Sequence, residues 1–250
     1  MSALDLYNHP SAQYAQRVER AIALLRDVAA THPRLTQASS LGVEDVVVTH
    51  LIHLAGIRSR IFVLETGRLH PETLALIPQI EQRYGRTIDR YHPVQEEVVH
   101  FVRTEGDDAM FRSVGLRKAC CELRKMEPLS RALAGVDGWI TGLRREQSNA
   151  RAEAAEVVQE PGRVKVSPLV DWTWGDVWHF VAEHHLAYNP LHDRFFPSIG
   201  CEPCTRAISV GEDFRAGRWW WEQDNAKECG LHVQPATSSL PTPRTERNPA

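Results

Sequence analysis

Arg34-Leu-Thr-Gln-Ala-Ser-Ser-Leu-Gly-Val-Glu-Asp45 is the stretch that decides the fold, because it predicts three kinds of local structure in succession. Arg34–Ala38 predicts a short β-strand, and the Ser39-Ser40-Leu41-Gly42 segment that follows is rich in turn-forming residues. A helix is expected from about Glu44 to Leu54. The stretch therefore predicts a strand, a polar loop and a helix.

The same order recurs as far as Arg145. The apolar run Ile61–Leu64 ends in Glu65-Thr66-Gly67, and the next helix is expected to begin at Pro71, a residue tolerated in a first helical turn. The remaining predicted elements are a strand Thr87–Tyr91, a helix Gln95–Arg103 and a strand Trp139–Thr141 that runs into Gly142-Leu143-Arg144-Arg145. Alternating strands and helices predict an α/β fold with a mostly parallel sheet covered on both faces.

Three of the predicted strands are each followed directly by a polar loop. Ser39, Glu65 and Arg144 each lie just after one of them. Ligands in such sheets bind beyond the carboxyl ends of the strands, so we expect these loops to converge on one crevice. Serine, threonine and glycine also form turns for structural reasons alone. Three such loops together favour a nucleotide site.

The overall composition limits the partners. The formal net charge is -3 and the sequence pI is about 6.5, so the chain as a whole does not attract nucleic acid. The sequence has no apolar run of about 18 residues, and Met1–Pro10 lacks the pattern of a signal peptide. We therefore expect a cytoplasmic protein that binds neither nucleic acid nor membrane.

The chain has five cysteines, in an arrangement of four plus one. Cys120 and Cys121 are adjacent, Cys201 and Cys204 form a Cys-Glu-Pro-Cys pair, and Cys229 stands alone. A reducing cytoplasm disfavours disulfides, so metal binding or catalysis is the better explanation.

Four thiolates suit either a tetrahedral zinc ion or an iron-sulfur cluster. Neighbouring side chains on a helix diverge by about 100°, which makes convergence on one zinc ion difficult. The corners of a broader [4Fe-4S] cluster are easier to reach, so the adjacent pair favours the cluster. The alternative is that Cys120 and Cys121 are small buried residues without a ligand.

Cys229 is the candidate nucleophile. A reactive thiol needs nearby positive charge and access to its electrophile. Arg215, Arg218 and Lys227 could supply the charge, and Gly230 would allow the backbone to bend. The alternative is an unreactive cysteine.

Lys125 is a second candidate. It follows Cys121 by four residues and shares its face if Arg117–Leu133 is helical. It could then place a cation between a cluster and a substrate. The alternative is a solvated surface lysine.

Taken together, these motifs resemble the sulfonucleotide reductases, specifically the iron-sulfur adenylyl-sulfate reductases that are thioredoxin-dependent and assimilatory. The resemblance extends from about Ser39 to His232. Its strongest parts are Cys120-Cys121-Glu122-Leu123-Arg124-Lys125, Gly200-Cys201-Glu202-Pro203-Cys204 and Lys227-Glu228-Cys229-Gly230-Leu231-His232. Supporting parts are Ser39-Ser40-Leu41-Gly42-Val43-Glu44-Asp45, Glu65-Thr66-Gly67-Arg68 and Gly142-Leu143-Arg144-Arg145-Glu146-Gln147-Ser148.

The resemblance implies roles for individual residues. It implies that the paired cysteines ligate the cluster and that Cys229 attacks the sulfate sulfur. It implies that Lys125, Arg215 and Arg218 face the sulfate and phosphate oxygens, with Arg144 and Arg151 as helpers. The loops expected at the nucleotide contribute Ser39, Ser40, Gly42, Glu65, Thr66 and Gly67.

The resemblance also implies a fold and a division of the chain. The fold is adenine nucleotide alpha hydrolase-like and related to the ATP pyrophosphatases. We expect a helical segment at 1–33, a nucleotide-binding domain with the cluster at 34–210, a catalytic segment at 211–233 and a disordered tail at 234–250. The tail is expected to be disordered because it is rich in proline, serine, threonine and charge.

The implied reaction converts adenylyl sulfate to sulfite and AMP, with thioredoxin or a glutaredoxin-like thiol as donor, in sulfate assimilation and cysteine biosynthesis. One alternative is the 3'-phosphorylated substrate. A second is a nucleotide-activating enzyme of the pyrophosphatase type. Its relatives carry Ser-Gly-Gly-x-Asp-Ser where this chain has one glycine, Gly42, which speaks against ATP cleavage. A third is a binding module without enzymatic activity, whose fold is stabilised by a bound metal. The sequence does not determine the oligomeric state and is compatible with a homo-oligomer.

Overall fold

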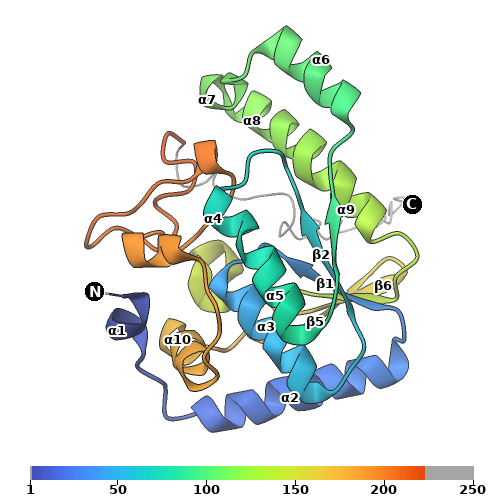
Figure 1. The fold of residues 1–250 in the computed structure, drawn as a ribbon, viewed down its shortest axis with the longest axis vertical. Helices are drawn as coiled ribbons and strands as arrows, with labels where there is room; N and C mark the ends of the chain where they lie inside the picture. The colour runs from blue at the N-terminus through green and yellow to red at the C-terminus, as the bar shows by residue number, and fades with distance from the viewer. Residues whose placement is uncertain (1, 223–250) are drawn as a thin grey trace, which may run out of the picture.

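The computed structural model describes residues 2–222 and is built around a six-stranded sheet (Figure 1). The strands are β1 (Leu35–Ser39), β2 (Arg60–Leu64), β3 (Ile88–Tyr91), β4 (Gly138–Ile140), β5 (Val157–Glu160) and β6 (Arg163–Val166). Their order is β3-β2-β1-β4-β6-β5, and every pairing is parallel except that of the edge strand β5 with β6. The predicted α/β fold is confirmed.

Helices connect the strands at the predicted places. They are α1 (Ala3–Tyr7), α2 (Tyr14–Thr31), α3 (Val43–Ala55), α4 (Pro71–Leu74), α5 (Leu76–Tyr84), α6 (Gln95–Glu105), α7 (Ala109–Arg112), α8 (Val114–Cys121), α9 (Glu127–Ala132) and α10 (Trp174–Glu183). A π-helical turn, η1 (Glu122–Met126), lies between α8 and α9. Short 3-10 turns are η2 (Arg145–Gln147), η3 (Asn149–Arg151), η4 (Pro190–Arg194) and η5 (Glu202–Cys204).

Both faces of the sheet are covered, as predicted. Side chains alternate along a strand, so successive residues of β2 face opposite layers. Ile61 and Val63 join the core formed with α2, α3, α5 and α10. Phe62 packs in a second cluster with Leu129 of α9 and with Trp139. Burial on both sides explains why Ile61–Leu64 reads as a continuous apolar run.

One element of the sheet was not predicted. The sequence predicts four strands, whereas β5 and β6 form an additional hairpin at the edge. Pro161-Gly162 makes the turn, and the positive φ of Gly162, 77°, suits a glycine. A Pro-Gly pair between two short β-branched runs was the available signal.

The segment from Arg117 to Leu133 is helical, but it is not one regular α-helix. In η1 the amide of Glu127 donates to the carbonyl of Glu122, five residues back. Pro128 accounts for the change, because a proline has no amide hydrogen and its ring crowds the carbonyl four residues earlier. Figure 1 shows α6 and α7 at the far end of the molecule from α2, with α8 to α9 returning to the sheet. The π-turn therefore lies where this helix reaches the sheet.

No helix within residues 2–222 is long and apolar enough to span a lipid bilayer.

Candidate active site

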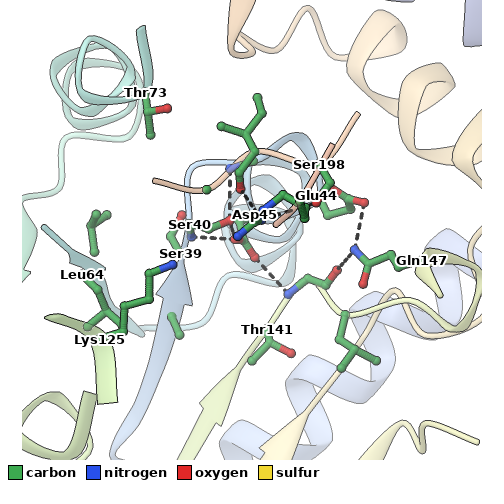
Figure 2. A pocket seen from close by; sticks show the side chains of 18 of the residues that line it. Ser39, Ser40, Glu44, Asp45, Leu64, Thr73, Lys125, Thr141, Gln147 and Ser198 are labelled. Atoms are coloured by element: carbon green, nitrogen blue, oxygen red, sulfur yellow. Dashed lines mark hydrogen bonds between the residues drawn. The ribbon is translucent and has the colours of Figure 1, made fainter. Parts of the chain in front are cut away.

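A pocket lies at the carboxyl ends of the central strands (Figure 2). Its walls include Ser39 at the end of β1, Leu64 and Thr66 at the end of β2, and Thr141 and Gly142 after β4. We call it the strand-end pocket. The position is the one expected for a ligand of a parallel α/β sheet.

The loop after β1 is held in place by its own serine side chains and by Asp45 in the first turn of α3. Ser40 donates from its amide and its hydroxyl to Asp45 Oδ2, both at 2.6 Å. The amide of Leu41 donates to Ser39 Oγ, and the amide of Gly42 donates to Ser40 Oγ. Leu41 has a φ of 61°, a conformation unusual for leucine, which these hydrogen bonds hold in place.

Asp45 also ties this loop to the one after β4. The amide of Gly142 donates to Asp45 Oδ1 at 3.0 Å, and a Cβ at position 142 would lie 2.7 Å from the same oxygen. The close approach requires glycine there. Burial raises the pKa of Asp45 to about 6, while the hydrogen bonds from Ser40 and Gly142 act in the opposite direction. Asp45 was part of a quoted motif but received no role from the sequence.

Arg144 is turned into the protein. Its side chain is 1% exposed and donates to Glu44 Oε1 at 3.1 Å and to Glu146 Oε2 at 2.7 Å. It is not among the residues that line the strand-end pocket. Arg151 does line it, and its Nη1 donates to Gln147 Oε1 at 2.5 Å. The structure therefore brings Arg151, and not Arg144, to the pocket.

Four cationic side chains from distant segments line the strand-end pocket: Lys125, Arg151, Arg215 and Arg218. Figure 2 shows Lys125 directed at the loop of Ser39 and Ser40. Glu44 and Asp45 also line the pocket, but the four cations outnumber these two carboxylates. The pocket is therefore suited to an anionic ligand.

Arg218 has the most distinctive environment of these cations. It is 7% exposed, and its Nη1 donates weakly to Ser198 Oγ at 3.5 Å and to the carbonyl of Ile199 at 3.2 Å. Within residues 2–222 no carboxylate forms an ion pair with Arg218, and its Nε has no hydrogen-bond partner there. A Cβ on Gly200 would collide with its guanidinium group. Gly200 thus leaves space for a cation at the pocket wall.

A second, smaller pocket is lined by all four paired cysteines, Cys120, Cys121, Cys201 and Cys204. We call it the cysteine pocket. The four side chains are thiols rather than disulfides. Burial raises the pKa of Cys120 and raises that of Cys204 to about 11, which favours the protonated form of these two thiols. Binding to iron or zinc would displace these protons.

Cations surround the cysteine pocket. Arg68, Arg117, Arg124 and Lys125 line it, and the hydroxyl of Thr66 lies 3.3 Å from Cys201 Sγ. Such positive charge would offset the negative charge of a multi-thiolate cluster, so these residues fit a group with several thiolate ligands. Across residues 2–222, no group of three or more His, Cys, Asp or Glu side chains is arranged to hold a single metal ion.

Lys125 and Trp219 line both pockets, so they form the wall that the two pockets share. The indole of Trp219 is 1% exposed, with the guanidinium carbons of Arg117 and Arg218 each 4.7 Å from its ring centre. The sequence suggested a cation between the two sites at Lys125. It assigned no role to Trp219, Arg68, Arg117 or Arg124, although Arg68 and Arg124 stand in quoted motifs.

The remaining predicted residues fall in three places. Ser39, Ser40, Gly42 and Thr66 line the strand-end pocket. Glu65 and Gly67 line a separate, open groove beside the cysteine pocket. Cys229 and Lys227 lie outside the described residues, as do the rest of the predicted 211–233 segment after Glu222 and the predicted tail at 234–250.

Comparison with known proteins points in one direction. A family model described as the phosphoadenosine phosphosulfate reductase domain matches residues 34–207. Adenosine 5'-phosphosulfate reductase from Burkholderia cepacia is 51% identical over 227 residues, which are 90% of this chain and 91% of the relative. The reductase of that name from Allochromatium vinosum is 49% identical over 236 residues, covering 93% and 92%.

Solved structures agree on the fold. Phosphoadenylyl-sulfate reductase from Candida auris, in a phosphate complex, superimposes with a TM-score of 0.63 at 25% identity, over 78% of this chain and 94% of that one. The NMN synthetase of Francisella tularensis gives a TM-score of 0.53 at 12% identity, over 71% of this chain and 73% of that one. The second likeness concerns the fold alone and fits the predicted adenine nucleotide alpha hydrolase-like architecture.

Proposed function

Because the chain belongs to the phosphoadenosine phosphosulfate reductase family, we propose that it reduces adenylyl sulfate to sulfite and AMP in sulfate assimilation. The observation that carries the proposal is the pairing of a cation-lined pocket at the strand ends with a four-cysteine pocket across Lys125 and Trp219. The two relatives with the highest identities given above are named as adenosine 5'-phosphosulfate reductases, which supports the unphosphorylated substrate.

In the proposed reaction the thiolate of Cys229 attacks the sulfate sulfur of adenylyl sulfate. A sulfur-sulfur bond forms, the bond between sulfur and the bridging oxygen breaks, and AMP leaves with the electron pair. A donor thiol then attacks Cys229 Sγ, releasing sulfite and forming a mixed disulfide, which the second donor thiol resolves. The donor dithiol is oxidised while the sulfur of sulfate is reduced by two electrons. We propose thioredoxin or a glutaredoxin-like protein as donor, and the cytoplasm as the location.

The cations of the strand-end pocket supply what this step needs. Attack on a sulfur surrounded by anionic oxygens is opposed by repulsion, and the departing AMP phosphate gains negative charge. Lys125, Arg215 and Arg218 line the pocket and are assigned to these oxygens. Arg151 lies at the same pocket and is assigned a supporting role. Arg144 instead organises the wall through Glu44.

We assign Cys120, Cys121, Cys201 and Cys204 as ligands of a [4Fe-4S] cluster. When bound, the cluster would supply a fixed charge distribution beside Lys125. The protein groups around the cluster would balance its charge and donate a hydrogen bond to a ligand. Arg68, Arg117 and Arg124 would offset the thiolate charge, and Thr66 is placed to donate to Cys201. Ligation would also keep these thiols from competing with Cys229 for the substrate.

The loop after β1 bears on the ATP-cleaving alternative. A phosphate-binding loop offers free backbone amides to its ligand. The amides of Ser40, Leu41 and Gly42 already donate to side-chain oxygens of the loop or of Asp45 in α3. This arrangement favours a reductase over a nucleotide-activating enzyme.

The decisive assay uses anaerobically prepared protein with reduced thioredoxin and measures sulfite. We expect sulfite from adenylyl sulfate and much less from the 3'-phosphorylated nucleotide. Preference for the phosphorylated substrate would reassign the enzyme within its family. Absence of sulfite from both, together with tight nucleotide binding, would favour a binding module.

We predict that the anaerobic protein carries iron and acid-labile sulfide in equal amounts, about four of each per chain, because four soft thiolate ligands share one pocket. Cys204→Ser should lose most of this iron, whereas Cys229→Ser should retain it. Iron and sulfide analysis of both variants checks the ligand set. Stoichiometric zinc without labile sulfide in the wild-type protein would contradict the cluster assignment.

A further inference from the structure

A buried ion pair ties the last described residues to the cysteine pocket. Arg117 donates from Nε and Nη2 to the two carboxylate oxygens of Glu222, at 2.9 and 2.7 Å. The two side chains are 1% and 2% exposed. Removing two charges from water is costly, so such a pair is weak evidence for stability and is better explained by the geometry that it fixes.

The other sides of Arg117 face the proposed cluster ligands. Arg117 lines the cysteine pocket with Cys120 and Cys121, and its guanidinium carbon lies 4.7 Å from the ring centre of Trp219. One guanidinium group thus contacts both the cysteine pocket and the chain that leads toward Cys229.

The backbone leading to Glu222 is held at several points. The amide of Trp219 donates to the carbonyl of Cys204 at 3.2 Å, and the amide of Glu222 donates to the carbonyl of Trp219 at 2.8 Å. Trp219 has a φ of 43°, a left-handed conformation that persists in a bulky residue only where the surroundings impose it. The course of the chain at Glu222 is therefore set by contacts around the cysteine pocket.

The position of Glu222 limits where Cys229 can act. The residues between them span at most about 25 Å when fully extended. A nucleophile delivered from a fixed starting point has a higher effective concentration at its target than one delivered from a loose end. The starting point lies at the cysteine pocket, which shares Lys125 and Trp219 with the strand-end pocket.

We propose that Arg117 is a positioning residue for sulfur transfer: through its ion pair with Glu222 it fixes the point from which the Cys229 segment reaches the substrate. The inference rests on the proposed function, since it takes Cys229 as the nucleophile. It places the effect on the rate of attack and not on nucleotide affinity, because neither Arg117 nor Glu222 lines the strand-end pocket.

The test compares Glu222→Gln with a matched control, Glu212→Gln. Glu212 also receives two hydrogen bonds from one arginine, Arg206, at 2.8 and 2.7 Å, but both side chains are about one third exposed and Glu212 lines neither pocket. Three quantities are measured in each variant: the single-turnover rate of sulfonate formation on Cys229, by mass spectrometry, the affinity for AMP, and the iron content. We expect Glu222→Gln to slow adduct formation about tenfold to a hundredfold. AMP affinity and iron content should stay within about twofold of the wild-type values, and Glu212→Gln should match the wild type in all three.

Two further variants separate positioning from charge. Glu222→Asp keeps the charge but shortens the link by one methylene group, so we expect a smaller loss of rate in a stably folded protein. It also decides the question if Glu222→Gln does not fold. Arg117→Met combined with Glu222→Gln should be no slower than the slower single variant, because both substitutions break the same link.

Four outcomes would overturn the inference. They are an unchanged adduct rate in Glu222→Gln, a loss of AMP affinity that parallels the loss of rate, a wild-type rate in Glu222→Asp when Glu222→Gln does not fold, or independent, multiplying effects of the two substitutions. Failure of the wild-type protein to form any adduct would be a different result, since it would overturn the proposed function and this inference with it.

Discussion

Cys229→Ser abolishes turnover, lowering the rate of sulfite release by about a thousandfold or more. Serine replaces a polarisable, readily ionised thiol with a hydroxyl group that is barely nucleophilic without a general base. AMP affinity and iron content should be unchanged, because the pockets assigned to them lie within residues 2–222. Sulfite release by Cys229→Ser and by the wild type measures the loss, and AMP affinity and iron content serve as internal controls.

The wild-type protein offers a direct readout of the same step. Incubation with adenylyl sulfate and no donor thiol should leave a sulfite-sized adduct on Cys229, which added thiol releases. Peptide mapping by mass spectrometry locates it. An adduct on one of the paired cysteines, or sulfite made by the serine variant, would show that the nucleophile has been misassigned.

Arg218→Ala and Lys125→Ala should each weaken nucleotide binding and slow turnover, with a loss of about 1.5–3 kcal/mol, or roughly tenfold to a hundredfold. Arg218 is a buried guanidinium group without a carboxylate partner in residues 2–222, and Lys125 lies between the two pockets. Arg218→Lys should recover only part of the loss, because an ammonium group cannot reproduce a bidentate contact. Binding constants and turnover rates for adenylyl sulfate provide the comparison.

Two variants control this prediction. Lys118→Ala removes an exposed cation from the same helical segment as Lys125 and should have little effect. Gly200→Ala keeps Arg218 but places a Cβ against its guanidinium group, so we expect a loss similar to that of Arg218→Ala. Wild-type kinetics in both Arg218→Ala and Lys125→Ala would return these residues to a structural or solvated role.

The central part of the fold could be predicted because its signals are local. The runs at β2 and β4 are mostly apolar and end in polar loops, β1 leads directly into a turn-forming segment, and α3 is apolar along most of its length. The hairpin of β5 and β6 was missed because its strands are short and half-exposed, so their hydrophobic pattern is weak. Pro128 lay inside a predicted helix, which warned of an irregularity, but the sequence did not show that it would be a π-turn.

The site could be predicted only where a motif named the residue. The four paired cysteines, the Ser39 loop and Lys125 stand in recognisable runs, and the structure brings them to two adjoining pockets. Arg144 looked similar to Arg151 in the sequence, yet only folding shows that Glu44 engages the first and that the second reaches the pocket. The ion pair of Arg117 with Glu222 joins residues that are far apart in the sequence, so no local sequence pattern could predict it.

The π-turn η1 changes the rotational alignment of α8 relative to α9. The residues before it are aligned by the cysteine pocket, and those after it by the face of the sheet against which α9 packs. A regular helix could satisfy only one of these alignments, because each residue inserted or removed rotates everything beyond it by about 100°. The length of the segment between Cys121 and Pro128 is therefore constrained, and loss of a residue between Cys121 and Lys125 would rotate Lys125 by about 100° relative to the cysteines.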